Sequence, residues 1–317
     1  MKRLLSIVFV LSIVSNAGAQ LTLPAKSPQA ELQQTVGLTE IVIKYSRPSM
    51  QGRTVFGDLV PYGALWRTGA NENTTITFGD DVKVGDKELK AGTYAIYTRP
   101  GETFWEVILY SDTGNWGLPE QWDPTKVAAM VKVEAQSLTV PIETFTISLD
   151  DLHKDGASLA LMWENVYVGV QVTVPTVAKA TASIEELMDG EGISANDYFA
   201  AAQYYFQEEM DMAQAKNWID EAVAKNPDAY WMTRMQSLIY AKLGDTKGAI
   251  EAAKKSLVSA QKAGNLDEAM LVRRTLQEWG WEEIPDEIYC CSNHEKRHCG
   301  KLDQLEDMKK SGCTGIN

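Results

Sequence analysis

The chain has 317 residues, which is enough for two domains of ordinary size. Its formal net charge is −13 at pH 7, and this spread of acidic side chains argues against nucleic acid or an anionic membrane surface as the partner. No glycine-rich loop of the kind that cradles a phosphate occurs, so we expect no nucleotide cofactor, and indeed no cofactor of any class.

Residues 1–19 have the three parts of a secretory signal peptide. Lys2 and Arg3 form a positive start, an apolar run extends from Leu4 to Val14, and Ala17-Gly18-Ala19 is a small-residue cleavage site. The apolar run is too short for a membrane span, which needs roughly 20 residues. We therefore expect cleavage before Gln20, no lipid anchor because no cysteine is nearby, and a periplasmic or extracellular location.

Residues 27–175 alternate between apolar and polar side chains with period 2, which is typical of half-buried strands. The pattern predicts eight or nine short strands separated by Gly- and Asp-containing turns. The runs are Ile41–Ser46, Thr74–Phe78, Thr93–Thr98, Phe104–Tyr110, Lys132–Val140, Phe145–Leu149, Ser158–Trp163 and Val166–Val174, with one or two helical turns over Asp123–Met130. Because no long helix intervenes, an antiparallel β-sandwich or jelly-roll-like domain is predicted.

A Thr- and Ala-rich linker is predicted over 176–183, followed by a helical domain over 184–284. Similar residues recur there at a spacing of 34, the period of the tetratricopeptide (TPR) repeat. The pairs are Phe206 with Tyr240, Ala215 with Ala249, Ile219 with Ala253, and Ala222 with Ser256. The sequence thus predicts TPR-like helical hairpins, with residues 264–281 as a third, capping helix, and a concave face that binds a protein partner. The predicted fold class is α+β with two domains.

Residues 285–317 are polar and aperiodic and contain all four cysteines of the chain, from which we predict a disordered tail. Its alternatives are a disulfide-bonded segment and a zinc site made by Cys290, Cys291, His294, His298 and Cys299. We expect no metal.

One polar and aromatic stretch stands out in the β domain. It comprises Tyr45-Ser46-Arg47-Pro48, Gly52-Arg53, Phe56-Gly57, Val60-Pro61-Tyr62-Gly63 and Trp66-Arg67-Thr68-Gly69-Ala70-Asn71-Glu72. This series of motifs resembles an uncharacterised family of exported bacterial proteins, known as a domain of unknown function, over about residues 25–175. The resemblance implies an extracytoplasmic β domain, in some members followed by helical repeats, and implies no activity.

The residues of that stretch suggest two candidate binding groups. Arg67, beside a turn with Asn71 and Glu72, has the chemistry to grip a carboxylate or a sugar hydroxyl, unless Arg67 pairs with Glu72 and Asn71 caps the turn. Arg47 continues the core face of its strand. It therefore forms either a buried ion pair with Glu106, Glu143 or Glu164, or an anion-binding pair with Arg53 in a cleft.

Aromatic side chains that stack on a sugar would be most accessible in a loop. Trp116 and Trp122 lie in the predicted loop 114–124 and are the candidates, whereas Trp66, Trp105 and Trp163 lie in alternating runs and are expected in the core.

Catalytic signals are weak. The β domain has one histidine, His153, in an exposed-looking turn, which makes a Ser-His-Asp triad improbable. A two-carboxylate hydrolase would need a pair drawn from Glu72, Glu106, Glu143 and Glu164. We therefore favour a non-catalytic binding or scaffold protein of the cell envelope, for a glycan, peptide or protein ligand. An envelope-polymer hydrolase, in which Arg47 and Arg67 orient the substrate, is the alternative.

Overall fold

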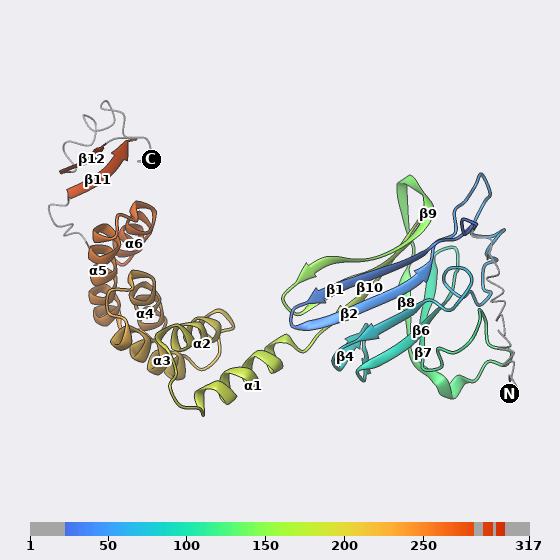
Figure 1. Ribbon diagram of the computed structural model, residues 1–317, viewed down its shortest axis with the longest axis horizontal. Helices are drawn as coiled ribbons and strands as arrows, with labels where there is room; N and C mark the ends of the chain where they lie inside the picture. The colour runs from blue at the N-terminus through green and yellow to red at the C-terminus, as the bar shows by residue number, and fades with distance from the viewer. Residues whose placement is uncertain (1–22, 282–287, 294–295, 302–317) are drawn as a thin grey trace, which may run out of the picture. The chain divides into compact units, whose positions relative to one another are not determined.

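The computed structural model describes residues 23–281, 288–293 and 296–301, so the predicted signal peptide lies outside the described residues. Contacts divide the chain into two compact units, with the boundary after Thr181. The first unit is a β domain and the second is helical (Figure 1).

The β domain consists of two antiparallel sheets. The six-stranded sheet has the order β1 (Gln29–Val36), β2 (Thr39–Ser46), β3 (Thr75–Phe78), β6 (Gly92–Arg99), β7 (Phe104–Tyr110) and β8 (Val127–Glu134). The four-stranded sheet has the order β5 (Lys87–Leu89), β4 (Val82–Val84), β10 (Gly156–Thr173) and β9 (Gln136–His153). The long hairpin of β9 and β10 dominates the second sheet (Figure 1). The predicted antiparallel sandwich is confirmed.

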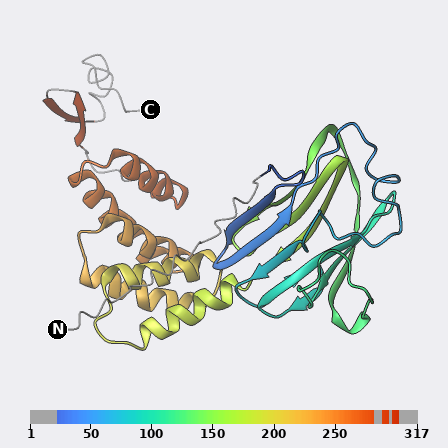
Figure 2. The same ribbon diagram turned by 45° about the vertical axis from the view of Figure 1, so that its right-hand side comes forward.

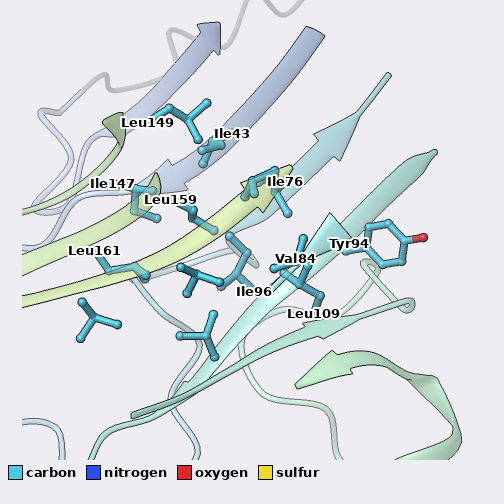
Figure 3. Close-up of a cluster of buried hydrophobic side chains, with 14 of the residues drawn as sticks. Ile43, Ile76, Val84, Tyr94, Ile96, Leu109, Ile147, Leu149, Leu159 and Leu161 are labelled. Atoms are coloured by element: carbon cyan, nitrogen blue, oxygen red, sulfur yellow. The ribbon is translucent and has the colours of Figure 1, made fainter. Parts of the chain in front are cut away.

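The two sheets enclose one apolar core, because each buries alternate side chains toward the other. Ile43, Ile76 and Leu109 come from the first sheet and meet Ile147 and Leu161 of the second (Figure 3). Burial alternates at the C-terminal end of β10, where Val168, Val170 and Val172 are fully buried. The hydroxyl of Tyr45 on β2 lies 3.2 Å from the carbonyl oxygen and 3.0 Å from the amide nitrogen of Ile147 on β9, which ties the sheets together.

Several strand boundaries differ from the sequence prediction. The run Lys132–Val140 is two strands, because the chain leaves β8 after Glu134 and starts β9 at Gln136. The reverse holds at Ser158–Trp163 and Val166–Val174, which form the single strand β10 with register shifts around Glu164. Asp123–Met130 contains a 3-10 turn, η1 (Pro124–Lys126), and then enters β8. Strands β1, β4 and β5 were not predicted, because they are short or largely polar.

The predicted linker 176–183 is helical, being the first half of helix α1 (Thr176–Met188). Its Ala- and Lys-containing sequence favours a helix once the start is held in place. Lys179 holds it: Nζ donates to the carbonyl oxygen of Leu38 at 2.8 Å and to Asp80 Oδ2 at 2.6 Å. The Lys179 and Thr39 side chains donate hydrogen bonds to Asp80 and lower the pKa of its carboxyl group.

The helical unit contains antiparallel hairpins in which each helix packs against the next one along the chain. The helices are α2 (Ala195–Gln207), α3 (Met212–Lys225), α4 (Tyr230–Lys242), α5 (Thr246–Lys262) and α6 (Leu266–Glu278) (Figure 2). Helix α6 occupies the segment predicted as the capping helix.

The 34-residue repeat is real at the level of packing. Ala215 and Ile219 on α3 are fully buried, as are their counterparts Ala249 and Ala253 on α5. The small side chains of the three alanines let neighbouring helices approach closely. The helix starts repeat as well, since the carboxylates of residues 211 and 245, both aspartates 34 residues apart, accept hydrogen bonds from backbone amides in the first turns of α3 and α5. The TPR-like helical hairpins are therefore confirmed, as is the α+β fold class.

Part of the predicted disordered tail is ordered as a hairpin. Strands β11 (Ile288–Asn293) and β12 (Lys296–Lys301) pair in antiparallel register. The β-prone residues at its start, Ile288 and Tyr289, favour the pairing. The cysteine and histidine side chains of this segment lie outside the described residues, as do 285–287, 294–295 and 302–317, so the disulfide and zinc alternatives stay predictions. Within the part of the chain that the structure describes, no helix is long and apolar enough to cross a bilayer.

Candidate functional site

A cleft of about 620 Å³ lies in the β domain where the β2–β3 connection, residues 47–74, folds over the end of the sandwich. Most of its lining comes from this connection. Lys26 and Ser27 from the segment before β1 and Trp163 from β10 complete it. Part of the stretch singled out in the sequence, including Arg53, Arg67 and Asn71, therefore lines one cleft.

The β2–β3 connection is fixed by hydrogen bonds to strands on both sheets. Ser49 forms a bridge with Thr144 of β9, and the amide of Trp66 donates to the carbonyl oxygen of Thr98 of β6 at 2.8 Å. Between them, Glu164 of β10 accepts hydrogen bonds from the amides of Val55 and Phe56 at 3.3 and 3.2 Å. The cleft walls are therefore positioned by the rigid sheets.

Aromatic rings form the floor. Trp66 stacks on Trp163 with ring centroids 5.8 Å apart, and Phe56, Trp105 and Phe145 pack around this pair. Trp105 and Trp163 are only 2% exposed, as the sequence predicted. They give the floor stiffness and apolar character, but they present no open ring face.

Arg67 lines the cleft half-buried. Its Nη1 donates to the carbonyl oxygen of Asn71 at 3.1 Å. Behind the guanidinium lies Gly117, which has φ = +84° and where a Cβ atom would stand 2.9 Å from Nη1. The loop that carries Gly117 is anchored by Tyr97, whose hydroxyl oxygen lies 3.2 Å from the Gly117 carbonyl oxygen and whose pKa is raised by burial. Arg67 does not pair with Glu72.

Arg53 also lines the cleft, at its exposed side. Its Nε donates to the carbonyl oxygen of Met50 at 2.8 Å and its Nη2 to that of Ser49 at 2.7 Å. Neither Arg53 nor Arg67 forms an ion pair within the described part of the chain. Both guanidinium groups are held by backbone oxygens, which orient them without neutralising their charge.

Arg47 is not part of the cleft lining. Its Nε donates to the carbonyl oxygen of Phe145 at 3.0 Å and its Nη2 to Thr146 Oγ1 at 2.8 Å. Both predictions for Arg47 were wrong. The guanidinium is satisfied by the backbone and a hydroxyl of β9, so it needs neither a buried carboxylate nor a ligand, and Arg53 does not join it.

The side chains of Asn71 and Glu72 face two different hollows. Asn71 lines the cleft, has the left-handed φ of +59° that the turn was expected to need, and directs its amide nitrogen to the Ser27 carbonyl oxygen at 3.2 Å. Glu72 faces a separate hollow beside β1 and β2, where it accepts a hydrogen bond from Gln29 at 3.0 Å. Adjacent residues point to opposite sides of the wall, which removes Glu72 from the candidate site.

The two loop tryptophans lie in different environments. Trp116 is 70% exposed but does not line the cleft. Trp122 stacks on Tyr110 with centroids 4.6 Å apart and meets Tyr97 edge-on, in a small cluster on the outer face of the six-stranded sheet. Trp122 is thus a partly buried packing residue that does not line the cleft, so it does not belong to this candidate site.

The charge of the cleft lining is its most distinctive property. Lys26, Arg53 and Arg67 line it, and none of its described lining residues is Asp or Glu. By contrast, three other hollows of the described chain each contain at least two carboxylates. A cationic cleft in a chain of net charge −13 is a local reversal of sign that attracts anions.

The carboxylates considered for catalysis are engaged elsewhere. Glu106 pairs with Arg99, Glu143 accepts a hydrogen bond from the amide of Gln51 at 2.8 Å, and Glu164 supports the cleft wall from behind. His153 is exposed and is the last residue of β9, with Nδ1 2.8 Å from the Asp151 carbonyl oxygen. None of these residues lines the cleft.

The sequence missed three contributors to the site: Lys26, Trp163 as a floor residue, and Gly117 behind Arg67. The first two come from segments far from the β2–β3 connection, so no local pattern links them to it. The glycine between Trp116 and Leu118 was visible as a turn signal, but its contact with Arg67 depends on how the loop folds back.

Comparison with known proteins finds a family model that matches the β domain and carries no activity. Residues 27–172 match the family model described as "Protein of unknown function (DUF2911)", as the sequence resemblance implied. No curated protein matches the chain. One solved structure, a tetratricopeptide repeat domain protein from Salinibacter ruber, matches 31% of this chain and 98% of its own length at 16% identity, with a TM-score of 0.27.

Proposed function

We propose that this protein, with its DUF2911 domain followed by TPR-like helices, is a non-catalytic binding protein of the bacterial cell envelope. Its β domain holds the ligand in the cleft formed by the β2–β3 connection. The observation that carries the proposal is a cleft with three cationic side chains and no carboxylate among its described lining residues.

This distribution of charge supports binding over hydrolysis. Glycoside hydrolysis by the usual mechanism needs two carboxyl groups on either side of the bond that breaks, and peptide or ester hydrolysis needs a nucleophile with a neighbouring base. The described lining offers neither arrangement, since its hydroxyl groups belong to Ser27 and Ser49 and no histidine accompanies them. An envelope-polymer hydrolase therefore remains the weaker alternative.

The helical unit supports a second role as a surface for a protein partner. Repeated helical hairpins present an extended surface that binds proteins in many unrelated chains. The ordered packing of α2 to α6, with buried alanines at the crossings, gives such a surface a stable base. Export of the chain, predicted from residues 1–19, would place both functions in the envelope.

A binding screen of the purified protein against envelope glycans and peptides tests this proposal. We expect at least one hit whose binding is lost in Arg67→Ala and kept in Arg274→Ala, a control that removes an exposed arginine from α6. Any hit is also incubated with the protein and analysed for cleavage products. Cleavage that survives purification to homogeneity would favour the hydrolase, and hits unaffected by Arg67→Ala would move the binding site elsewhere.

A further inference from the structure

We propose that the cleft is selective for a carboxylate attached to an apolar group. This inference rests on the proposed binding function and names the class of ligand. The ligand's carboxylate is recognised by Arg67 and Arg53, with Lys26 adding charge, and its apolar group lies on the side of the cleft lined by Leu59, Pro61 and Trp66.

The cleft is lined by three cationic side chains, those of Lys26, Arg53 and Arg67. Some cations of the described chain are neutralised by a carboxylate, as Lys179 is by Asp80 and Lys126 by Asp112. The cations of the cleft form no ion pair with a carboxylate of the described residues, and Glu143, which does not line the cleft, is bound to the amide of Gln51. An anion that enters the cleft therefore gains attraction without displacing a protein carboxylate.

The two guanidinium groups are oriented before a ligand arrives. Each is fixed on one edge by backbone carbonyl oxygens, which leaves other N–H groups of its planar fork available. The fork geometry of arginine matches the two oxygens of a carboxylate, and orientation in advance lowers the entropy lost on binding. Gly117 contributes by allowing the Arg67 guanidinium to lie against its backbone.

The turn that follows Arg67 contains two non-glycine residues with positive φ. Thr68 has φ = +55° and Asn71 has φ = +59°, in the left-handed region that asparagine tolerates and threonine rarely adopts. Thr68 is therefore a strained position directly after Arg67.

The rest of the lining decides what accompanies the carboxylate. Leu59 and Trp66 are apolar and reach the cleft, whereas Trp163 is 2% exposed and offers no ring face on which a sugar would stack. Trp116 has an exposed ring, but it is outside the lining. An aliphatic or aromatic group beside the carboxylate fits this surface better than a polyhydroxylated ring.

Matched ligands test the class. Isothermal titration of the full protein compares N-acetyl-L-phenylalanine with its neutral amide. We expect the acid to bind at least about tenfold more tightly, which is about 1.4 kcal/mol, and its affinity to fall with rising salt. Arg67→Gln and Arg53→Gln should each weaken acid binding by about tenfold or more, because each removes a charge-assisted contact. Arg274→Gln removes the same charge from α6 and should leave the affinity within about twofold.

A second pair of variants tests orientation without a change of charge. Gly117→Ala should weaken acid binding by several fold, since the new Cβ pushes on Arg67. Gly63→Ala imposes a similar backbone strain, at φ = +76°, with nothing within 4 Å of the new Cβ, and should leave binding unchanged. Thermal unfolding of each variant confirms that it is folded.

Three results would overturn the inference while leaving the proposed function to the binding screen. They are equal binding of acid and amide, equal binding of inorganic phosphate and the acid, and no binding of the acid at millimolar concentration. If the acid binds, a peptide that ends in phenylalanine with a free carboxylate is compared with octanoate, which identifies a peptide C-terminus or a free carboxylic acid as the source.

Discussion

Replacing Arg47 by alanine separates a structural arginine from a ligand-binding one. The Arg47 side chain joins the end of β2 to β9 through two hydrogen bonds, at 3.0 and 2.8 Å. Hydrogen bonds to charged groups contribute roughly 1.5–3 kcal/mol each when they are protected from water. Since Arg47 is half-buried and water can replace part of the loss, we expect the free energy of unfolding of the β domain to fall by about 2–3 kcal/mol.

For a domain of this size, each kcal/mol lowers the melting temperature by roughly 2–4 °C, so Arg47→Ala should lower it by roughly 4–12 °C. Arg67 makes a single 3.1 Å bond to the backbone of exposed Asn71. Arg67→Ala should therefore cost about 0.5 kcal/mol or less, a shift of at most about 2 °C. Ligand binding should show the opposite order, with a loss in the Arg67 variant and none in the Arg47 variant at a temperature where both are folded.

Differential scanning calorimetry, with tryptophan fluorescence to follow the β domain, measures both shifts. Arg47→Lys is the matched control, because it keeps the charge and loses the fork that spans Phe145 and Thr146. It should recover only a minor part of the stability. Equal melting temperatures for the Arg47 and Arg67 alanine variants would refute the assignment of roles, as would full recovery by lysine.

Three further predictions concern packing and pH. Trp122→Ala should lower the free energy of unfolding by about 2–3 kcal/mol, because its ring packs on two tyrosines. Trp116→Ala should lower it by less than about 0.5 kcal/mol, because that ring is solvent-exposed. Denaturant titration compares the two variants, and equal effects would contradict the packing described for these tryptophans. Asp80→Asn should lower stability by about 1 kcal/mol at pH 7. Because the pKa of Asp80 is lowered in the folded protein, its contribution to stability is fully present above pH 3.8 and is lost as the pH falls through the lowered value. The difference in stability between Asp80→Asn and the unchanged protein should therefore shrink below pH 3.8. Thermal melts at a series of pH values measure this difference. Ala253→Leu should destabilise the helical unit by about 1–3 kcal/mol through overpacking, whereas Lys255→Leu on the exposed face of α5 should not, as measured by circular dichroism at 222 nm.

Most of the fold could be predicted from the periodicity of apolar residues in the sequence. The alternation of Val168, Val170 and Val172 identified a strand with one buried face, and the 34-residue spacing of Ala215 and Ala249 identified the helical hairpins. Such patterns show which face of one strand or helix is buried, so they can be recognised without knowing which other elements pack against that face. Periodicity could not identify β4 and β5, which have three residues each, nor the helical state of 176–183, which depends on the contact of Lys179 with Asp80.

The candidate site was harder to predict, for a reason visible in single residues. The sequence located the stretch that carries Arg53, Arg67 and Asn71, since glycines, arginines and aromatics cluster there. It could not distinguish Arg47 from Arg67, because their roles depend on partners near residue 145 and at Gly117, contributed by other segments.

The sequence by itself determined the two-domain α+β architecture, the helical repeat, the expectation of export, and the stretch from which the cleft walls are made. Tertiary structure alone decided which side chains share the cleft. Glu72 and Asn71 are neighbours in the chain but face different hollows, while Lys26 and Trp163 are far apart in the chain and line the same one. The physical reason is that burial is encoded by the residue's own chemistry and local period, whereas a binding site depends on long-range contacts that no local pattern specifies.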